Sequence, residues 1–187
     1  MRAVLTRARR SSTPSASAQS ARVSNALRAA EGHRIVATYA SVGDEPDTLR
    51  LINELHAGGV RVLLPVLAQS RTPTWGFFDG ELVPGFRGIP EPANSPLGAD
   101  ALGQASFILT SALAVTPRGY RLGTGGGWWD RALLHARPDA VVAVLVNDDE
   151  VVEGLPVDEW DVPVDLIVTE TRILPTNRVD APSPTTG

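Results

Sequence analysis

Short apolar runs alternate with amphipathic segments through the first half of the chain. Residues 35–39 and 60–67 are rich in β-forming side chains, and residues 48–55 between them carry apolar side chains at helical spacing. Gly58 and Gly59 end this helical pattern. A strand, a helix and a second strand joined by a crossover of about twenty residues predict a parallel βαβ unit.

The same alternation continues in the second half of the chain. Residues 106–110 and 141–146 are apolar runs, and residues 128–136 between them have the spacing of a helix. Two shorter runs, at residues 166–169 and 172–174, predict the last strands. We therefore expect an α/β fold with three layers, in which a mostly parallel central sheet carries helices on both faces, as in Rossmann-like proteins.

Three other segments have less regular patterns. Thr13 and Pro14 resemble an N-cap followed by proline at the first helical position, which predicts a helix with apolar residues over 23–30. Residues 69–98 are rich in proline and glycine and predict a hairpin and a long loop over one face. The acidic residues at 147–150 predict a turn that faces water.

The composition is that of one globular unit. With 187 residues, of which 43% are hydrophobic, the chain can bury one sizeable core. We expect a single domain over residues 1–175 and a flexible tail over residues 176–187. The absence of cysteine excludes disulfides, a thiolate nucleophile and cysteine metal sites. No apolar run approaches a membrane span and no signal-peptide core is visible, so we expect a cytoplasmic protein without a membrane partner.

The charge is unevenly distributed. The net charge is -4, whereas residues 1–34 contain seven arginines and one acidic residue, Glu31. This basic segment lacks the interleaved aromatic residues of a nucleic-acid-binding surface, and a solvated amphipathic helix explains it as well. We expect a monomer without a nucleic-acid partner.

Candidate functional residues are most concentrated in residues 121–131, which have the sequence Arg-Leu-Gly-Thr-Gly-Gly-Gly-Trp-Trp-Asp-Arg. Four glycines within five positions free the backbone to curl around a ligand with its amides pointing inward. Such a loop before a helix suits phosphate. Arg121 and Arg131 flank it with planar donors for phosphate oxygens, and Asp130 offers a carboxylate of the kind that holds magnesium beside phosphates.

Two common glycine-rich motifs do not fit this loop. All 17 basic residues are arginines, so a Walker A loop with its phosphate-binding lysine is excluded. The dinucleotide fingerprint needs a glycine spacing that Gly123, Gly125 and Gly126 do not have. A simpler alternative remains open, namely a tight loop into a helix in which Asp130 complements the helix dipole and Arg131 is solvated.

The string from Arg121 to Arg131 resembles the signature of the 5-formyltetrahydrofolate cyclo-ligase (methenyltetrahydrofolate synthetase) family, R-L-G-x-G-x-G-[FY]-Y-D-R. The resemblance continues in the same order at residues 44–48, 64–66, 88–92 and 155–165. It implies conversion of 5-formyltetrahydrofolate, with or without a polyglutamate tail, to 5,10-methenyltetrahydrofolate. ATP would be the co-substrate, Mg²⁺ the cofactor and an iminium phosphate the intermediate, with ADP and phosphate released.

The resemblance also implies which residues bind the nucleotide and the metal. Those implied for ATP are Arg2, Arg121, Leu122, Gly123, Thr124, Gly125, Gly126, Gly127, Trp128 and Trp129. Arg121 and Asp130 would be the catalytic residues. Asp130 and Asp161 would hold the magnesium ion, although on the residues alone Asp161 is equally well a turn carboxylate.

The implied folate site involves a different part of the chain. Glu45 and Ala40 would bind the pterin, together with the aromatic side chains Trp75 and Trp128. Without the resemblance, Asp44 or Glu45 is better explained as the acidic start of the next helix. Trp75 is likewise more typical of a core residue, although an indole ring also stacks well on flat heterocycles.

Several positions depart from the family pattern. Where the family has proline, aspartate, tyrosine and histidine, this chain has Ser111, Thr116, Trp129 and Trp160. The family's lysine, four residues before the arginine that aligns with Arg2, would lie before Met1. Two other function classes therefore stay open, namely a non-catalytic nucleotide- or folate-binding relative and a sugar-phosphate enzyme on a related scaffold.

Overall fold

The computed structural model describes residues 1–12, 14–67, 72–158 and 161–177. Its helices are α1 (Arg2–Ser11), α2 (Ala16–Ala29), α3 (Leu49–Ala57) and α4 (Trp128–Leu133), with 3-10 turns η1 (Phe86–Gly88), η2 (Ala99–Gln104) and η3 (Asp148–Glu150). Its strands are β1 (Ile35–Ala37), β2 (Arg61–Pro65), β3 (Trp75–Phe77), β4 (Leu82–Pro84), β5 (Pro90–Pro92), β6 (Phe107–Ser111), β7 (Ala114–Val115), β8 (Arg121–Leu122), β9 (Val141–Leu145), β10 (Leu166–Val168) and β11 (Ile173–Pro175). None of the described helices is long and apolar enough to span a bilayer.

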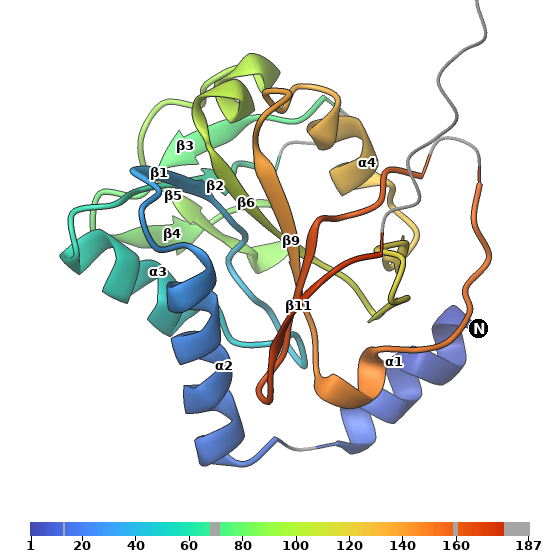
Figure 1. Ribbon diagram of the computed structural model, residues 1–187. Helices are drawn as coiled ribbons and strands as arrows, with labels where there is room; N and C mark the ends of the chain where they lie inside the picture. The colour runs from blue at the N-terminus through green and yellow to red at the C-terminus, as the bar shows by residue number, and fades with distance from the viewer. Residues whose placement is uncertain (13, 68–71, 159–160, 178–187) are drawn as a thin grey trace, which may run out of the picture.

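Seven strands form one central sheet in the order β11-β10-β9-β6-β1-β2-β3. The five inner strands are parallel to one another, and β11 and β3 close the two edges in the antiparallel direction. Helices α2 and α3 cover one face, and α4 with η2 covers the other (Figure 1). The expected three-layer, mostly parallel α/β fold is confirmed. Two short hairpins, β4-β5 and β7-β8, lie outside the sheet.

Alternate residues of each central strand enter two separate cores. Val36 of β1 packs into the core beneath α2 and α3, and the next residue, Ala37, packs into the core beneath α4. Phe107 and Ile108 of β6 divide in the same way. A strand buried on both faces needs apolar residues at every position, which is why continuous apolar runs predicted these strands.

The N-terminal region differs from the expectation. Residues 2–11 form α1, which the sequence pattern did not predict, and α2 begins at Ala16 rather than at Pro14. Ser15 is the N-cap of α2, and its hydroxyl accepts a hydrogen bond from the Ala18 amide at 3.1 Å. The proposed cap, Thr13, lies outside the described residues. Serine suits this position because its side chain satisfies an amide that has no partner within the helix.

Of residues 147–150 in the acidic turn after β9, only Asp149 is exposed, so the turn does not face water over its whole length as predicted. Asn147 and Glu150 are each only 7% exposed. Glu150 forms an ion pair with Arg9 of α1 at 2.6 Å, and Asp148 forms one with Arg172 at 2.8 Å. The prediction was wrong because the local sequence does not reveal arginines that reach the turn from distant segments.

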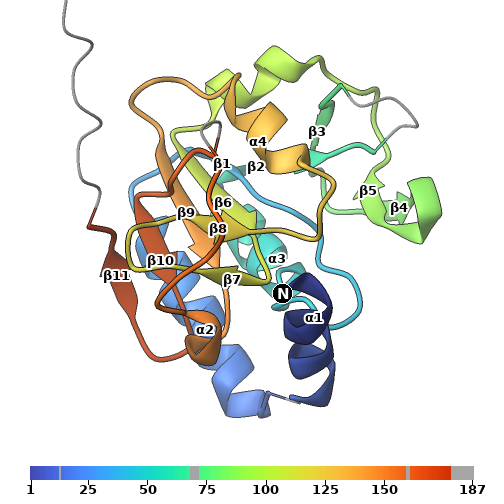
Figure 2. The same ribbon diagram turned by 90° about the vertical axis from the view of Figure 1, so that its right-hand side faces the viewer.

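The carboxyl ends of the parallel strands meet at one edge of the sheet. In open α/β sheets ligands bind at this edge. Helix α1 packs there, since Arg9 donates to the Ala112 carbonyl just beyond β6 at 2.6 Å. The view in Figure 2 shows α1 beside the β7-β8 hairpin, which leads directly into the glycine-rich loop. The unpredicted helix therefore lies next to the candidate site.

Candidate active site

Two adjoining cavities lie on either side of the glycine-rich loop. The first cavity is lined among others by Arg9, Ala40, Glu45, Ser111, Trp128 and Trp129. The second cavity is lined among others by Arg2, Leu122, Gly125, Arg131, Asp158 and Asp161. Arg121, Gly123, Gly127 and Asp130 line both. Two glycines of the loop, together with Arg121 and Asp130, therefore belong to the walls of both cavities.

The glycine loop has a backbone that only glycine adopts readily. Gly125 has φ +106° and Gly127, the N-cap of α4, has φ +57°. Within the described residues, the amides of residues 123–127 donate to no protein acceptor. Arg131 holds the loop from behind, since its Nη1 donates to the Gly126 carbonyl at 3.0 Å. The loop therefore has amide donors that no described protein group uses, which is compatible with the predicted binding of phosphate.

Arg121 is the most unusual charged residue of the site. Its side chain is only 5% exposed, and Nη1 donates to Asp130 Oδ1 at 2.7 Å. Its Nε and Nη2 atoms are buried and have no partner among the described residues. Burial lowers the pKa of Arg121, and the nearby charges of Asp130 and Asp161 oppose this effect. Buried donors without acceptors are costly, so this guanidinium is suited to an incoming anion.

Arg2 reaches the same loop from the N-terminus. Its Nε donates to the Gly123 carbonyl at 3.1 Å. A Cβ added at Gly125 would lie 3.8 Å from the Arg2 side chain, which is an ordinary contact distance. The arginine that was predicted to contact the nucleotide is thus placed beside the loop by α1. The other residues predicted for ATP also line one or both cavities, namely Leu122, Gly123, Thr124, Gly125, Gly126, Gly127, Trp128 and Trp129.

Asp130 and Asp161 line the second cavity together. Asp161 Oδ2 accepts a hydrogen bond from the Asp158 amide at 2.8 Å. The described residues contain no cluster of three or more acidic or histidine side chains that could enclose a metal. Magnesium is often held by only one or two carboxylates, with phosphates and water completing its ligands. The two aspartates fit a metal that arrives with a phosphorylated ligand.

Glu45 lies in the first cavity and does not begin a helix. The first turn of α3 contains no acidic residue, and the N-cap is Thr48. Glu45 Oε2 accepts a hydrogen bond from the Val42 amide at 3.0 Å. Burial raises the pKa of the Glu45 carboxyl, although the Val42 amide and the charge of Arg9 act in the opposite direction. A carboxylate held in a partly buried cavity beside Ala40 can accept from the N–H groups of a heterocycle.

The two tryptophans expected at the folate, Trp75 and Trp128, have different positions in the structure. Trp128 and Trp129 line the first cavity and pack edge to face, with ring centroids 5.0 Å apart. Trp75 is completely buried and packs against Trp128 at 5.1 Å. A ring without exposed surface offers no face for stacking, so the expected contact of Trp75 with the folate is corrected to support of the cavity wall.

Two departures from the family pattern contact each other. The indole Nε1 of Trp129 donates to Ser111 Oγ at 3.2 Å. An indole N–H is a donor only, and the serine hydroxyl supplies an acceptor at this position. Thr116 is buried at 5% exposure and makes no contact that explains its substitution, and Trp160 lies outside the described residues.

Sequence reasoning missed two residues of the first cavity. Arg9 and Tyr39 both line it, and both are buried. The one possible signal for Arg9 is its spacing of seven residues after Arg2, which is informative only within a helix that the sequence pattern did not predict. Seven residues are about two helical turns, so the two side chains share one helix face. Tyr39 had no such signal, since it follows a strand like many core aromatics.

Known proteins resemble this chain over most of its length. Residues 1–170 match the model of the 5-formyltetrahydrofolate cyclo-ligase family. The 5-formyltetrahydrofolate cyclo-ligase of Mycolicibacterium smegmatis is 39% identical over 145 residues, which cover 74% of this chain and 75% of the relative. The enzyme of that name from Escherichia coli K12 is 34% identical over 143 residues, with 74% and 79% covered.

Solved structures agree with these sequence matches. The 5,10-methenyltetrahydrofolate synthetase of Aquifex aeolicus superposes with a TM-score of 0.79 at 24% identity, covering 99% of this chain and 95% of its own. The synthetase of Mycoplasma pneumoniae has a TM-score of 0.70 at 16% identity, covering 90% and 96%. At these identities the superpositions establish the shared fold.

Proposed function

This chain belongs to the 5-formyltetrahydrofolate cyclo-ligase family, and from that premise we propose that it converts 5-formyltetrahydrofolate to 5,10-methenyltetrahydrofolate at the expense of ATP. The observation that supports this most directly is the pair of cavities that share the glycine loop, Arg121 and Asp130. A nucleotide in the second cavity would place its terminal phosphate at this shared wall. A folate in the first cavity would meet it there.

The reaction needs activation of a poor electrophile. The N5 formyl group is an amide, so its carbon resists attack and its oxygen is a poor leaving group. Attack of the formyl oxygen on the γ-phosphorus of ATP forms an iminium phosphate and releases ADP. N10 then attacks the activated carbon and releases its proton to solvent, and the C–O bond breaks with loss of phosphate. No protein nucleophile takes part in this sequence.

The contribution of the chain is therefore positioning and charge stabilisation. The amides of residues 123–127 and the unpaired donors of Arg121 would bind phosphate oxygens. Arg2 would approach the nucleotide from the other side of the loop. Asp130 and Asp161 would hold magnesium, which neutralises phosphate charge when bound. Glu45 would accept from the amide-like edge of the pterin.

The direct test is turnover by the purified protein. With ATP, magnesium and 5-formyltetrahydrofolate present, we expect the near-ultraviolet absorbance of the methenyl product to appear together with one ADP for each product molecule. Omission of the folate should stop ADP release. Binding of both ligands by calorimetry without product would contradict the proposal and favour a non-catalytic relative. Turnover of a sugar phosphate without nucleotide would favour the third function class.

A further inference from the structure

Helix α1 carries two arginines on one face, and only one of them lies at the nucleotide side. Arg2 contacts the Gly123 carbonyl at the loop, as described above. Arg9 lies two turns further along and lines the first cavity. The family signature in the sequence assigns no role to Arg9. Its buried position in the wall of this cavity calls for an explanation, because arginine is rarely buried without a function or a complete set of partners.

Most of the Arg9 guanidinium is held by the protein. Its Nε donates to Glu150 Oε1 at 2.6 Å, and its Nη2 donates both to Glu150 Oε2 at 2.6 Å and to the Ala112 carbonyl at 2.6 Å. This bidentate arrangement fixes the plane of the group. Nη1 makes no hydrogen bond to any described residue, and it is absent from the buried atoms that lack partners. The side chain thus has one nitrogen left for a ligand.

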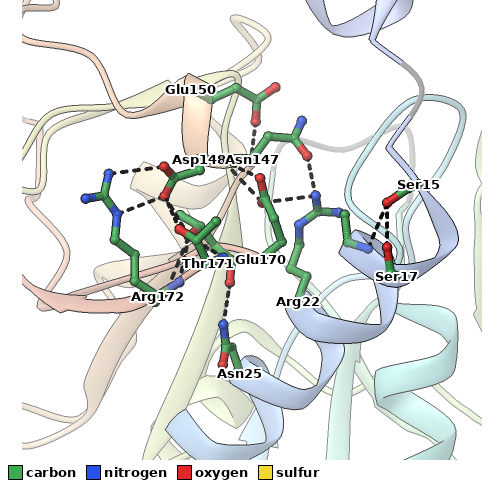
Figure 3. Close-up of polar contacts among 12 residues, drawn as sticks. Ser15, Ser17, Arg22, Asn25, Asn147, Asp148, Glu150, Glu170, Thr171 and Arg172 are labelled. Carbon is green, nitrogen blue, oxygen red and sulfur yellow. Dashed lines mark hydrogen bonds and ion pairs between the residues drawn. The ribbon is translucent and has the colours of Figure 1, made fainter.

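The turn that holds Arg9 is itself fixed by buried polar contacts. Glu150 Oε2 also accepts from the Asn147 amide at 2.8 Å. Arg22 of α2 donates to the Asn147 side chain and, at 3.2 Å, to Glu170 beyond β10. Figure 3 shows Asn147 between Glu150 and Arg22, with Glu170 next to them. Two helices and the loops after two strands therefore set the position of one guanidinium.

The two buried arginines of the first cavity face different groups. Arg121 is close to Asp130 and Asp161, the side on which we place the nucleotide. Arg9 lines the first cavity together with Tyr39 and Glu45, and its charge opposes the rise that burial causes in the pKa of Glu45. A pterin whose N3–H and 2-amino groups are held by Glu45 has its 4-oxo oxygen next to them on the same edge. An acceptor at that point needs a donor, and Arg9, which lines this cavity together with Glu45, has a nitrogen available for it.

We propose that Arg9 is a substrate-contacting residue, whose Nη1 donates to the 4-oxo oxygen of the pterin while Glu45 accepts from the neighbouring N–H groups. The carboxylate and the guanidinium together match the donor, donor, acceptor order of a 2-amino-4-oxo edge. Glu150 acts through Arg9 and is a positioning residue. This inference rests on the proposed function, because it requires a folate in the first cavity.

The test compares two ligands on the same variants. One ligand is 5-formyltetrahydrofolate, and the other is its analogue with a 4-amino group in place of the 4-oxo group. Binding is followed without ATP through the fluorescence of Trp128 and Trp129, which line the cavity. The variant Arg9→Lys keeps a positive charge beside Glu150, but its ammonium is occupied by Glu150 and the Ala112 carbonyl. Arg7→Lys, at an exposed position of the same helix, is the matched control.

We expect Arg9→Lys to weaken binding of the 4-oxo ligand about tenfold, the effect of one hydrogen bond from a charged donor. The 4-amino ligand, which offers a donor to a donor, should lose no affinity. Glu150→Gln should show the same ligand selectivity and a raised KM with little change in kcat. Arg7→Lys should bind both ligands as the unmodified protein does.

Equal losses for the two ligands, or no loss for either, would overturn the role of Arg9 whatever the stability of the variant, since both ligands are compared on one protein. Failure of the unmodified protein to bind either ligand is a different result. It would overturn the proposed function itself and with it the assignment of the first cavity to folate.

Discussion

Replacement of Asp130 by asparagine separates the structural role of this carboxylate from its proposed role at the metal. In the free protein Asp130 is the partner of Arg121, with the two side chains 32% and 5% exposed. With nucleotide bound, the same carboxylate is proposed to hold magnesium. The substitution Asp130→Asn keeps the shape of the side chain and removes its charge, so the two roles can be measured under different conditions.

The expected loss of stability is modest. Two unit charges about 4 Å apart attract by about 4 kcal/mol in partly buried surroundings, but desolvation offsets much of this. The asparagine oxygen can still accept from Arg121 Nη1, so we expect a net loss of about 2 kcal/mol. For a protein of this size that lowers the Tm by about 4–8 °C. The variant should therefore be folded at room temperature.

The effects on nucleotide binding should differ in sign. Without magnesium, removal of a negative charge beside the phosphates should leave ATP affinity unchanged or raise it. With magnesium, loss of a carboxylate ligand should weaken binding about ten- to a hundredfold, which corresponds to about 1.4–2.8 kcal/mol. Turnover should fall below detection, because the metal would no longer be held between nucleotide and protein.

Calorimetric titration with ATP in magnesium and in chelator checks this difference directly. Asp139→Asn is the matched control, because Asp139 pairs with Arg137 at 2.6 Å on the exposed surface and lines neither cavity. If Asp130→Asn still binds ATP more tightly with magnesium than without it, or if both affinities fall by the same factor, the assignment of Asp130 to the metal is refuted.

Two further substitutions test the cavity walls. Burial raises the pKa of Glu45 above the ordinary 4.5, so the folded protein binds the proton more tightly than the unfolded chain and loses stability as the pH rises from about 4.5 through the folded-state pKa. Glu45→Gln should therefore raise the Tm at pH 7.5 more than at pH 5 while it weakens folate binding, and a Tm gain that is independent of pH would contradict this. Gly125→Ala places a Cβ on a residue with φ +106° and should reduce ATP affinity at least tenfold by straining the loop. Gly126→Ala adds a Cβ that has no atom within 4 Å, so it should change ATP affinity little. Titration of both variants with magnesium-ATP measures this difference.

The central sheet could be predicted from the sequence because burial on both faces leaves a simple pattern. The runs around Val62, Ile108 and Val144 contain almost no polar residues, and all three are fully buried. The glycine loop could be predicted for a similar reason, since glycine adopts the positive φ values at Gly125 and Gly127 more readily than any other residue. Where the backbone or a two-sided environment restricts the choice of residue, the sequence records the restriction.

Interactions between distant charged residues leave no such record. Arg9 and Glu150 lie 141 positions apart, and each looks like a solvated surface residue in its own segment. Helix α1 was missed for this reason, because its docking depends on an arginine rather than on an apolar face. Trp75 illustrates the reverse case, since the sequence identifies an aromatic residue but does not reveal whether it forms the wall of a cavity or its support.

The two buried arginines of the site differ in how far the free protein satisfies their hydrogen-bond donors. Arg9 has its charge balanced by Glu150 through two hydrogen bonds, so the free protein fixes its position at little cost. Arg121 has one carboxylate and two buried donors without described partners, so the free protein holds it in an unfavourable state. A neutral oxygen is a sufficient acceptor for Arg9. Arg121 gains most from an anion, above all from one whose negative charge increases during the reaction. These properties agree with the proposed positions of the pterin beside Arg9 and of the transferred phosphoryl group beside Arg121.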